Sequence, residues 1–243
     1  MKPHTITFVG AGPGAADLIT LRGVNALQNA QVVLYDALID HGVLEHAHKD
    51  ALMVDVGKRG VGEKCAQSKK QSDINLELIR YGLQYERVVR LKGGDPAIFG
   101  RLDEEIHAVL SVGLDYEIIP GVSSALAAAA SAKTALTRRG VARSVRLLTA
   151  SVGTDQPDNL WHSHIAPTET LVFYMGGLHR QAVAQTLLDK GFSEDTPVVM
   201  VFGASWDDEH ILRLDLTRMA RNDFVPPDTD APCIILVGKG LRV

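Results

Sequence analysis

Two kinds of hydrophobic pattern alternate along the first half of the chain. Short apolar or β-branched runs predict strands at 5–9, 32–35, 52–56, 87–91 and 116–119. Between them, apolar positions three or four apart predict helices that begin near Thr20, run over 72–83 with Ser72 as a candidate N-cap, and run over 101–112 up to Gly113. Strands that alternate with helices are typical of a parallel sheet covered by helices.

The pattern restarts after Pro120 and Gly121, which interrupt it. A helix is predicted at 124–132, strands at 144–149, 170–175, 198–202 and 233–237, and a further helix at 178–190 closed by Gly191. The stretches 153–159 and 222–230 have the composition of loops. We therefore predict an α/β protein of two α/β domains, residues 1–119 and 120–243.

The composition favours a globular protein and restricts its partners. Of the 243 residues, 46% are hydrophobic and 22% are charged, and the formal net charge is −4. An acidic balance argues against binding to nucleic acid. The two cysteines stand far apart and predict no disulfide framework. No apolar run reaches the roughly 18 residues of a membrane helix and no secretory segment is present, so we expect a cytoplasmic protein outside the membrane.

The first predicted strand runs into a glycine turn that has two interpretations. The sequence GAGPGA at 10–15 fits the dinucleotide fingerprint, and Asp36 follows where an acid would hold a ribose, which favours a nicotinamide-dependent oxidoreductase. However, Pro13 and Gly14 stand where the fingerprint's helix should begin, and the periodic segment starts only near Thr20. A wider loop is therefore expected, and a plain tight turn also explains the glycines.

Three more glycine-containing loops follow predicted strands. They are GGDP at 93–96, PGVSS at 120–124 and FYMGG at 173–177. Glycine lets a ligand approach the main chain closely, and ligands of open α/β sheets bind at the carboxyl ends of strands. Each loop alone is a weak signal, but together they predict one extended cleft for a small molecule.

Two local runs of positive charge occur in this acidic chain. Residues 58–70 hold five basic residues against Glu63 alone, and four arginines fall within 138–146. Both runs fit a solvated surface. They also fit a site for a polyanion with several carboxylates, because arginine pairs with carboxylate or phosphate.

The histidines do not predict a metal site. The close pairs are His46 with His48 and His162 with His164. Neither pair has the i, i+4 spacing of a helical zinc motif or a third ligand in a recognisable pattern, so no metal is expected.

Six segments occur in the order that a known family shows. They are VGAGPG at 9–14, VVLYDALI at 32–39, VGKR at 56–59, RLKGGDPAIFGR at 90–101, PGVSSALAAAA at 120–130 and LVFYMG at 171–176. Over nearly its whole length the chain resembles the uroporphyrinogen-III C-methyltransferases of the tetrapyrrole methylase superfamily. The YD pair followed by VGKR favours this group over the precorrin methylases that act later in cobalamin synthesis.

This resemblance implies two α/β domains with the active site in the cleft between them, and a homodimer. It implies that S-adenosylmethionine is held largely by main-chain groups and leaves as S-adenosylhomocysteine. By match to the motifs, the cofactor would contact Pro13, Gly93, Gly94, Asp95, Ile98, Ser123, Ser124, Met175 and Ala204. From the local positive charge, and not from a motif, we expect the carboxylates of a tetrapyrrole substrate to meet Arg59, Arg138, Arg139 and Arg143.

The implied reaction methylates uroporphyrinogen III at C2 and then at C7 and gives precorrin-2, which feeds siroheme, cobalamin or haem d1. Methylation at carbon leaves a cationic ring that must lose a proton, and by the resemblance Asp36 would accept it. Lys58 would be a proton donor, or a charge partner for a substrate carboxylate.

The chain departs from the family pattern at three places. The usual GDPFIFGRGGEE reads GDPAIFGRLDEE at 94–105, LTHRD reads LTRRG at 136–140, and VENGT reads VFGAS at 201–205. Three alternatives stay open from the sequence: another precorrin C-methyltransferase of the same superfamily, a nicotinamide-dependent oxidoreductase, and a non-catalytic binder of S-adenosylmethionine or a tetrapyrrole.

Overall fold

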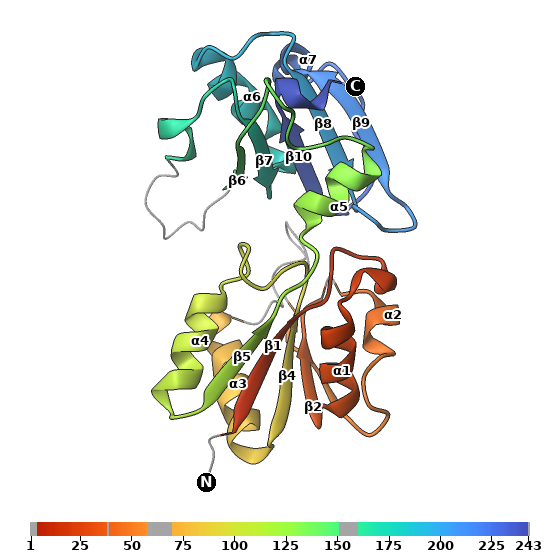
Figure 1. Cartoon of the computed structure of the whole chain (residues 1–243), viewed down its shortest axis with the longest axis vertical. Helices are drawn as coiled ribbons and strands as arrows, with labels where there is room; N and C mark the ends of the chain where they lie inside the picture. The colour runs from red at the N-terminus through yellow and green to blue at the C-terminus, as the bar shows by residue number, and fades with distance from the viewer. Residues whose placement is uncertain (1–3, 38, 58–69, 151–159, 243) are drawn as a thin grey trace. The chain divides into compact units, whose positions relative to one another are not determined.

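The computed structural model describes residues 4–37, 39–57, 70–150 and 160–242. The chain divides into two compact units, Met1–Ser124 (unit 1) and Ala125–Val243 (unit 2), each with its own sheet (Figure 1). The boundary predicted after Ile119 falls at the end of the last strand of unit 1 and stays a prediction.

Unit 1 contains a five-stranded parallel sheet, as the alternating pattern predicts. Its strands are β1 (Thr5–Gly10), β2 (Val32–Tyr35), β3 (Leu52–Asp55), β4 (Arg87–Lys92) and β5 (Asp115–Ile119), in the order β3-β2-β4-β1-β5. Every neighbouring pair is parallel, so all five carboxyl ends lie along one edge of the sheet.

Helices cover both faces of this sheet because successive residues of a strand point to opposite sides. Helices α1 (Leu21–Asn29) and α2 (His41–Leu44) lie on one face, and α3 (Gln71–Gln84) and α4 (Leu102–Ser111) on the other (Figure 1). In β1, Val9 packs with Leu27 of α1, whereas its neighbour Phe8 belongs to the core that contains Leu78 of α3.

The ends of these helices follow the sequence with one exception. Thr20 caps α1 by accepting a hydrogen bond from the Gly23 amide at 3.1 Å, and Gly113 adopts a φ of +77° just after α4. Ser72 is not the N-cap of α3, because the helix begins one residue earlier and Lys70 occupies that position.

Unit 2 has a mixed sheet rather than a second parallel one. Its strands are β6 (Val145–Thr149), β7 (Thr170–Tyr174), β8 (Pro197–Phe202), β9 (His210–Asp215) and β10 (Cys233–Val237), in the order β6-β7-β10-β8-β9. Only β6 and β7 are parallel neighbours among these described strands. The pattern predicted four of these strands and missed β9, an edge strand that is only partly buried.

Helix α5 (Ser124–Ser131) begins at the division between the units, and α6 (Arg180–Asp189) and α7 (Leu216–Arg221) belong to unit 2. Leu187 of α6 and Met219 of α7 pack on Phe173 and Met200 in one core. The helix predicted at 178–190 is a short 3₁₀ turn (Gly177–His179) followed by α6. Further 3₁₀ turns span Ala16–Leu18, Trp161–His164 and Lys239–Leu241. Among the described helices, none is long and apolar enough to cross a membrane.

Candidate functional site

Three glycine loops of unit 1 meet at the carboxyl edge of its sheet. A Cβ atom on Gly10 would lie 2.5 Å from Gly121 Cα and 2.7 Å from the carbonyl oxygen of Gly94. A Cβ on Gly121 would lie only 2.2 Å from that same oxygen. The ends of β1, β4 and β5 therefore approach so closely that only glycine fits. The sequence marked the loops that contain Gly10 and Gly121, but it did not predict this contact because it does not give the strand order.

Hydrogen bonds between main-chain groups join the loop after β1 to the loop after β4. The Gly94 amide donates to the Gly12 carbonyl at 2.7 Å, and the Gly12 amide donates back to the Gly94 carbonyl at 3.3 Å. Both residues have left-handed φ angles, +85° at Gly12 and +67° at Gly94, which glycine adopts without strain. The Ala11 amide adds a bond to the Lys92 carbonyl at 2.8 Å.

The predicted cofactor residue Asp95 ties the loops together. Its Oδ2 accepts a hydrogen bond from the Gly121 amide at 3.0 Å, and its Oδ1 accepts one from the Ala97 amide at 2.9 Å. Both carboxylate oxygens thus bind main-chain amides of unit 1. In the described structure Asp95 fixes the distance between the β4 and β5 loops.

Main chain is accessible beside this crossing. Gly93 is exposed, and a Cβ added to it would have no heavy atom within 4 Å. The Ser124 amide nitrogen lies 3.9 Å from the position of a Cβ on Gly94. Open space next to a rigid main chain suits a ligand that is held by main-chain groups, so the residues present fit the cofactor that the resemblance implies. The structure brings Pro13, Gly93, Gly94, Asp95, Ile98, Ser123 and Ser124 to these three loops.

The glycine turn after β1 is wider than a dinucleotide-binding turn. Its last fingerprint position, Ala15, is followed by the 3₁₀ turn Ala16–Leu18, and α1 begins only at Leu21. Within the described residues 4–37, no helix N-terminus stands where a pyrophosphate would bind. In addition, Asp36 is engaged by Arg90, whose Nη2 lies 2.6 Å from Asp36 Oδ1. These features argue against the oxidoreductase alternative.

Asp36 lies just beyond the end of β2, next to strand β4, and its side chain is 31% exposed. Its partner Arg90 is buried and also binds the fully buried Glu105 of α4, which in turn binds Lys92. Although burial lowers it, the charges of Asp36 and Glu105 raise the pKa of Arg90, which therefore stays cationic. The sequence did not single out Glu105; the available signal was Arg90 and Lys92, two cations at the end of the strand RVVRLK that call for a buried anion.

The predicted residues Lys58 and Arg59 lie outside the described residues. The described segment stops at Gly57, whose added Cβ would lie 2.1 Å from the amide nitrogen of Ala37. The segment that follows β3 therefore packs directly against Ala37, the residue after Asp36.

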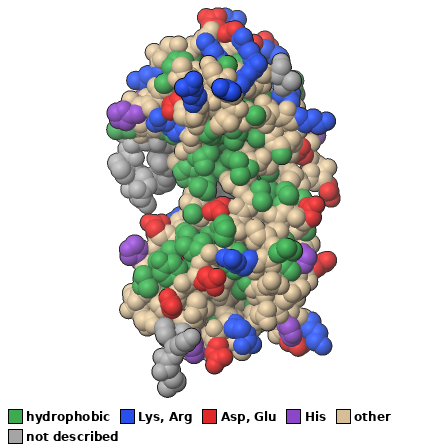
Figure 2. Space-filling model, in the orientation of Figure 1, with side chains coloured by type: hydrophobic (Ala, Val, Ile, Leu, Met, Phe, Trp, Pro, Cys, Tyr) green, Lys and Arg blue, Asp and Glu red, His purple; other side chains and the backbone are tan. Residues whose placement is uncertain are grey.

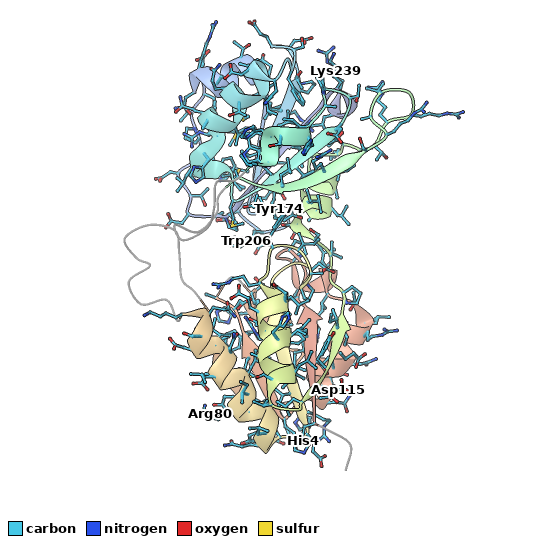
Figure 3. The ribbon with its side chains drawn as sticks, turned by 90° about the vertical axis from the view of Figure 1, so that its left-hand side faces the viewer. His4, Arg80, Asp115, Tyr174, Trp206 and Lys239 are labelled. Carbon is cyan, nitrogen blue, oxygen red and sulfur yellow. The ribbon has the colours of Figure 1, made fainter. Side chains whose placement is uncertain are left out.

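Two further predicted cofactor residues share one edge of the unit 2 sheet. Strands β7 and β8 are both antiparallel to β10, so Met175 after β7 and Ala204 after β8 lie at the same edge. Figure 3 shows Tyr174 and Trp206 at this end of the sheet, with Lys239 at the other end. Met175 (φ +54°) and Ser205 (φ +68°) are non-glycine residues in the left-handed region.

The arginines of the basic run at 138–146, which include the predicted substrate residues Arg138, Arg139 and Arg143, differ in their surroundings. The main chains of Arg138 and Ala142 form an antiparallel β-bridge across a tight turn. The side chain of Arg138 donates a hydrogen bond from Nη1 to the Arg242 carbonyl at 2.6 Å. Arg146 pairs with Glu169 at 2.9 Å. Arg139 and Arg143 are exposed, and blue side chains are concentrated on unit 2 in the face drawn in Figure 2. Arg139 and Arg143 are therefore the members of this run best suited to meet an anionic ligand.

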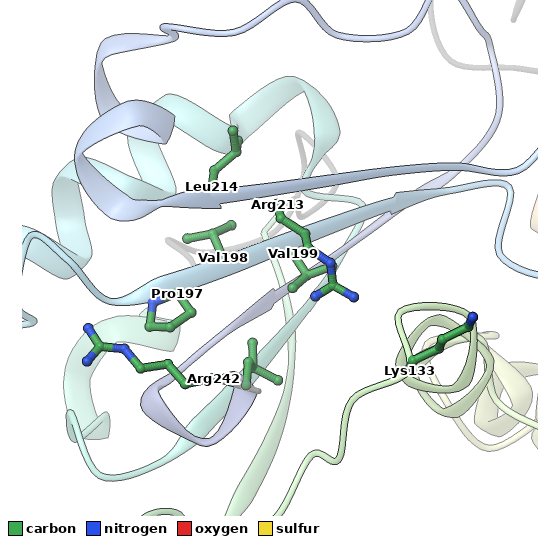
Figure 4. A pocket seen from close by; sticks show the side chains of 8 residues that line it. Lys133, Pro197, Val198, Val199, Arg213, Leu214 and Arg242 are labelled. Carbon is green, nitrogen blue, oxygen red and sulfur yellow. The ribbon is translucent and has the colours of Figure 1, made fainter.

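A pocket of about 440 Å³ in unit 2 is separate from this edge (Figure 4). It opens beside Pro197, the first residue of β8, whereas Ala204 follows the last. Of its three cations, Arg213 binds the Ala132 carbonyl, Arg242 binds Asp195, and the third is Lys133. Over the described residues, no group of three potential metal ligands comes together.

The chain is similar to known proteins over almost its whole length. The family model of tetrapyrrole (corrin/porphyrin) methylases matches residues 5–220. The chain is 36% identical over 240 residues to the siroheme synthase of Pseudomonas fluorescens (strain SBW25), and 37% identical over 238 residues to that of Zymomonas mobilis subsp. mobilis. These matches cover 98% of this chain but 50% and 49% of the two relatives, so the chain spans about half their length.

Solved structures share the fold. One is the uroporphyrin-III C-methyltransferase of Thermus thermophilus complexed with S-adenyl homocysteine, with a TM-score of 0.81 and 32% identity over 97% of this chain and 92% of that chain. Another is cobalt precorrin-4 methyltransferase, a cobalamin biosynthetic enzyme, with a TM-score of 0.82 and 28% identity over 99% and 97% of the two chains. The expected α/β class with two sheets is confirmed.

Proposed function

Because the chain belongs to the tetrapyrrole (corrin/porphyrin) methylases, we propose that it transfers methyl groups from S-adenosylmethionine to uroporphyrinogen III. Methylation at C2 and then at C7 gives precorrin-2 and S-adenosylhomocysteine. The proposal also includes a homodimer in the cytoplasm, with a small tetrapyrrole rather than nucleic acid as its partner.

The observation that carries this proposal is the crossing of three glycine loops at the carboxyl edge of unit 1. The crossing leaves main chain accessible at Gly93 and holds it rigidly through Asp95. The Thermus thermophilus enzyme, which shares the fold, is complexed with S-adenyl homocysteine. A relative of 32% identity with that ligand supports a site for the same cofactor here.

S-adenosylmethionine, when bound, supplies an electrophilic methyl group on a sulfonium and leaves as a neutral thioether. Gly93, Gly94 and Ile98 would hold it, with Ser123 and Ser124 beside them, and Met175 and Ala204 stay predicted contacts from unit 2. A rigid main chain aligns the donor for an in-line displacement, and such alignment supplies roughly 7–11 kcal/mol of a barrier.

The second task of the protein is to remove a proton. As the S–CH₃ bond breaks, an electron pair of the pyrrole carbon forms the new C–C bond, and the macrocycle gains a positive charge. A carboxylate that takes a proton from the ring restores neutrality. Asp36 fits this role because it lies at the carboxyl edge, is partly exposed and is fixed by Arg90. Lys58 stays the predicted proton donor or charge partner.

A second candidate is another precorrin C-methyltransferase. The comparable TM-score to cobalt precorrin-4 methyltransferase, 0.82, favours keeping it, because the fold alone does not select the acceptor. Under this alternative the cofactor site is unchanged and the acceptor differs.

The experiment is an anaerobic assay with methyl-labelled S-adenosylmethionine and either uroporphyrinogen III or precorrin-4 as the acceptor. We expect label to pass to uroporphyrinogen III. Label on precorrin-4 alone would support the second candidate. If neither acceptor is labelled although the protein binds S-adenosylhomocysteine, a non-catalytic binder is the better description.

A further inference from the structure

Under the carboxyl edge of unit 1, four charged side chains form one connected group: Asp36, Arg90, Lys92 and Glu105. We propose that Arg90 is a positioning residue for Asp36, and that Glu105 and Lys92 hold and balance Arg90 so that the side chain of Asp36 keeps its orientation. This inference rests on the proposed function, because it assigns a task to Arg90 in the removal of the ring proton.

The guanidinium of Arg90 is fixed by contacts on every nitrogen. Nε and Nη2 lie 3.3 and 3.1 Å from Glu105 Oε1, and Nη1 donates to the Leu91 carbonyl at 3.0 Å. Nη2 also donates to Asp36 Oδ1 at 2.6 Å. The side chain is 2% exposed, so it has no alternative partner in solvent. Because a planar guanidinium donates in fixed directions, these contacts set where the Asp36 carboxylate lies.

Glu105 is fixed as firmly as the arginine that it holds. Besides Arg90, it accepts hydrogen bonds from Lys92 Nζ at 3.1 Å and from Gln71 Nε2 at 3.2 Å. Glu105 is fully buried and Lys92 is buried. Strand β4, α4 and the first residue of α3 thus converge on one carboxylate, which makes the support of Arg90 rigid.

The four charges balance. Arg90 and Glu105 alone would neutralise each other and leave Asp36 facing the nearby negative charge of Glu105. Lys92 supplies the second cation, so that two anions face two cations. A buried ammonium is costly unless it is paired. Burial and then the charge of Arg90 lower the pKa of Lys92, while the charge of Glu105 opposes this. The charge balance therefore explains why a lysine, despite the cost of its burial, occupies position 92.

The group also supports the loop proposed to hold the cofactor. Arg90 and Lys92 are two residues apart on β4, so both point to the face covered by α3 and α4. The Lys92 carbonyl accepts the Ala11 amide, and a Cβ on Gly100 would lie 3.1 Å from Lys92 Cε. The loop that follows Gly93 therefore returns onto the lysine. Asp36 and the cofactor loop are held by one rigid support.

A double-mutant cycle in kcat tests this inference. Arg90→Met should lower kcat by about 10- to 100-fold, since misplacing a reacting group by ~1 Å costs up to about 100-fold. In an Asp36→Asn background the same substitution should change kcat less than about threefold, because the residue it positions no longer acts. The KM for S-adenosylmethionine should stay within about threefold in all four proteins of the cycle, because neither Arg90 nor Asp36 is a proposed cofactor contact and Lys92, which supports the cofactor loop, is unchanged.

Two further variants separate positioning from folding. Arg90→Met/Glu105→Gln removes one cation and one anion, keeps the charge balance, and should lose as much kcat as Arg90→Met. Arg90→Lys keeps the charge and should restore part of the kcat. The matched control is Arg87→Met on the same strand, where the exposed arginine donates to the Asn29 carbonyl at 2.7 Å; its kcat should not change.

If the wild-type protein is active and Arg90→Met lowers kcat by the same factor in the wild type and in the Asp36→Asn variant, this inference is overturned and the proposed function stands. A charge-balanced variant that folds and turns over normally would overturn it in the same way. A wild-type protein that binds S-adenosylhomocysteine but methylates no uroporphyrinogen III would overturn the proposed function, and this inference with it.

Discussion

Arg90 and Asp36 form an ion pair across the ends of two neighbouring strands, with 2.6 Å between Nη2 and Oδ1. The register of β2 and β4 sets Tyr35 opposite Leu91, so Asp36 comes directly after the last paired position. The arginine is buried and the carboxylate is partly exposed. A fixed cation thus holds an accessible carboxylate at the edge where the glycine loops meet.

Asp36→Asn removes the proposed proton acceptor and keeps the size of the side chain. We expect kcat for methylation to fall by about 10²–10⁴-fold, the usual contribution of a positioned acid or base. Calorimetry should give wild-type affinity for S-adenosylhomocysteine. If the variant loses cofactor binding instead, Asp36 holds the cofactor, as in the dinucleotide interpretation.

Gly93→Val tests the cofactor loop without disturbing the fold. Since a Cβ at this position meets no atom of the protein, the thermal midpoint should stay near that of the wild type. The added side chain should fill the space of the ligand and weaken S-adenosylhomocysteine binding at least about tenfold, or ~1.4 kcal/mol. Ala135→Val, at an exposed position of unit 2, is the control. Unchanged binding in Gly93→Val would remove this loop from the cofactor site.

Arg139→Gln/Arg143→Gln removes two exposed charges from the basic run of unit 2. Each exposed ion pair contributes about 0.2–1 kcal/mol, so KM for the tetrapyrrole should rise about 2- to 30-fold. KM for S-adenosylmethionine should not change. The control Lys190→Gln/Arg221→Gln removes two exposed charges elsewhere on the same unit. Equal increases in both KM values would show that the run does not bind substrate.

Glu105→Met leaves Arg90 and Lys92 without their shared anion. Because it breaks a buried pair, the free energy of unfolding in urea should fall by about 3–5 kcal/mol. The neighbouring Glu104 pairs with the exposed Arg101, and Glu104→Met should cost less than about 1 kcal/mol. Similar small losses for both variants would mean that the buried charges contribute little.

The sequence predicted the strands of unit 1 well because each is a short apolar run between turn residues. It also marked the loops that meet at the edge, through Gly93, Gly94 and Gly121. It did not show that Gly10 and Gly121 touch, since that contact exists only because β5 lies beside β1 in the sheet. Strand order depends on the whole fold and not on local pattern.

The buried charges were harder to predict. A glutamate such as Glu105, inside LDEEIHAVL, has the pattern of a solvated helix face until α4 is placed over β4. Likewise, β9 is an edge strand with polar residues, so its hydrophobic alternation is weak. The burial of Glu105 and the formation of β9 both depend on tertiary contacts, which the local sequence pattern does not contain.

The most direct measurement is the mass of the product formed from uroporphyrinogen III and S-adenosylmethionine under anaerobic conditions. We predict a product that carries two added methyl groups, with two molecules of S-adenosylhomocysteine formed for each macrocycle. An acceptor recovered without any added methyl group, from protein that is folded and binds S-adenosylhomocysteine, would contradict methylation of this substrate.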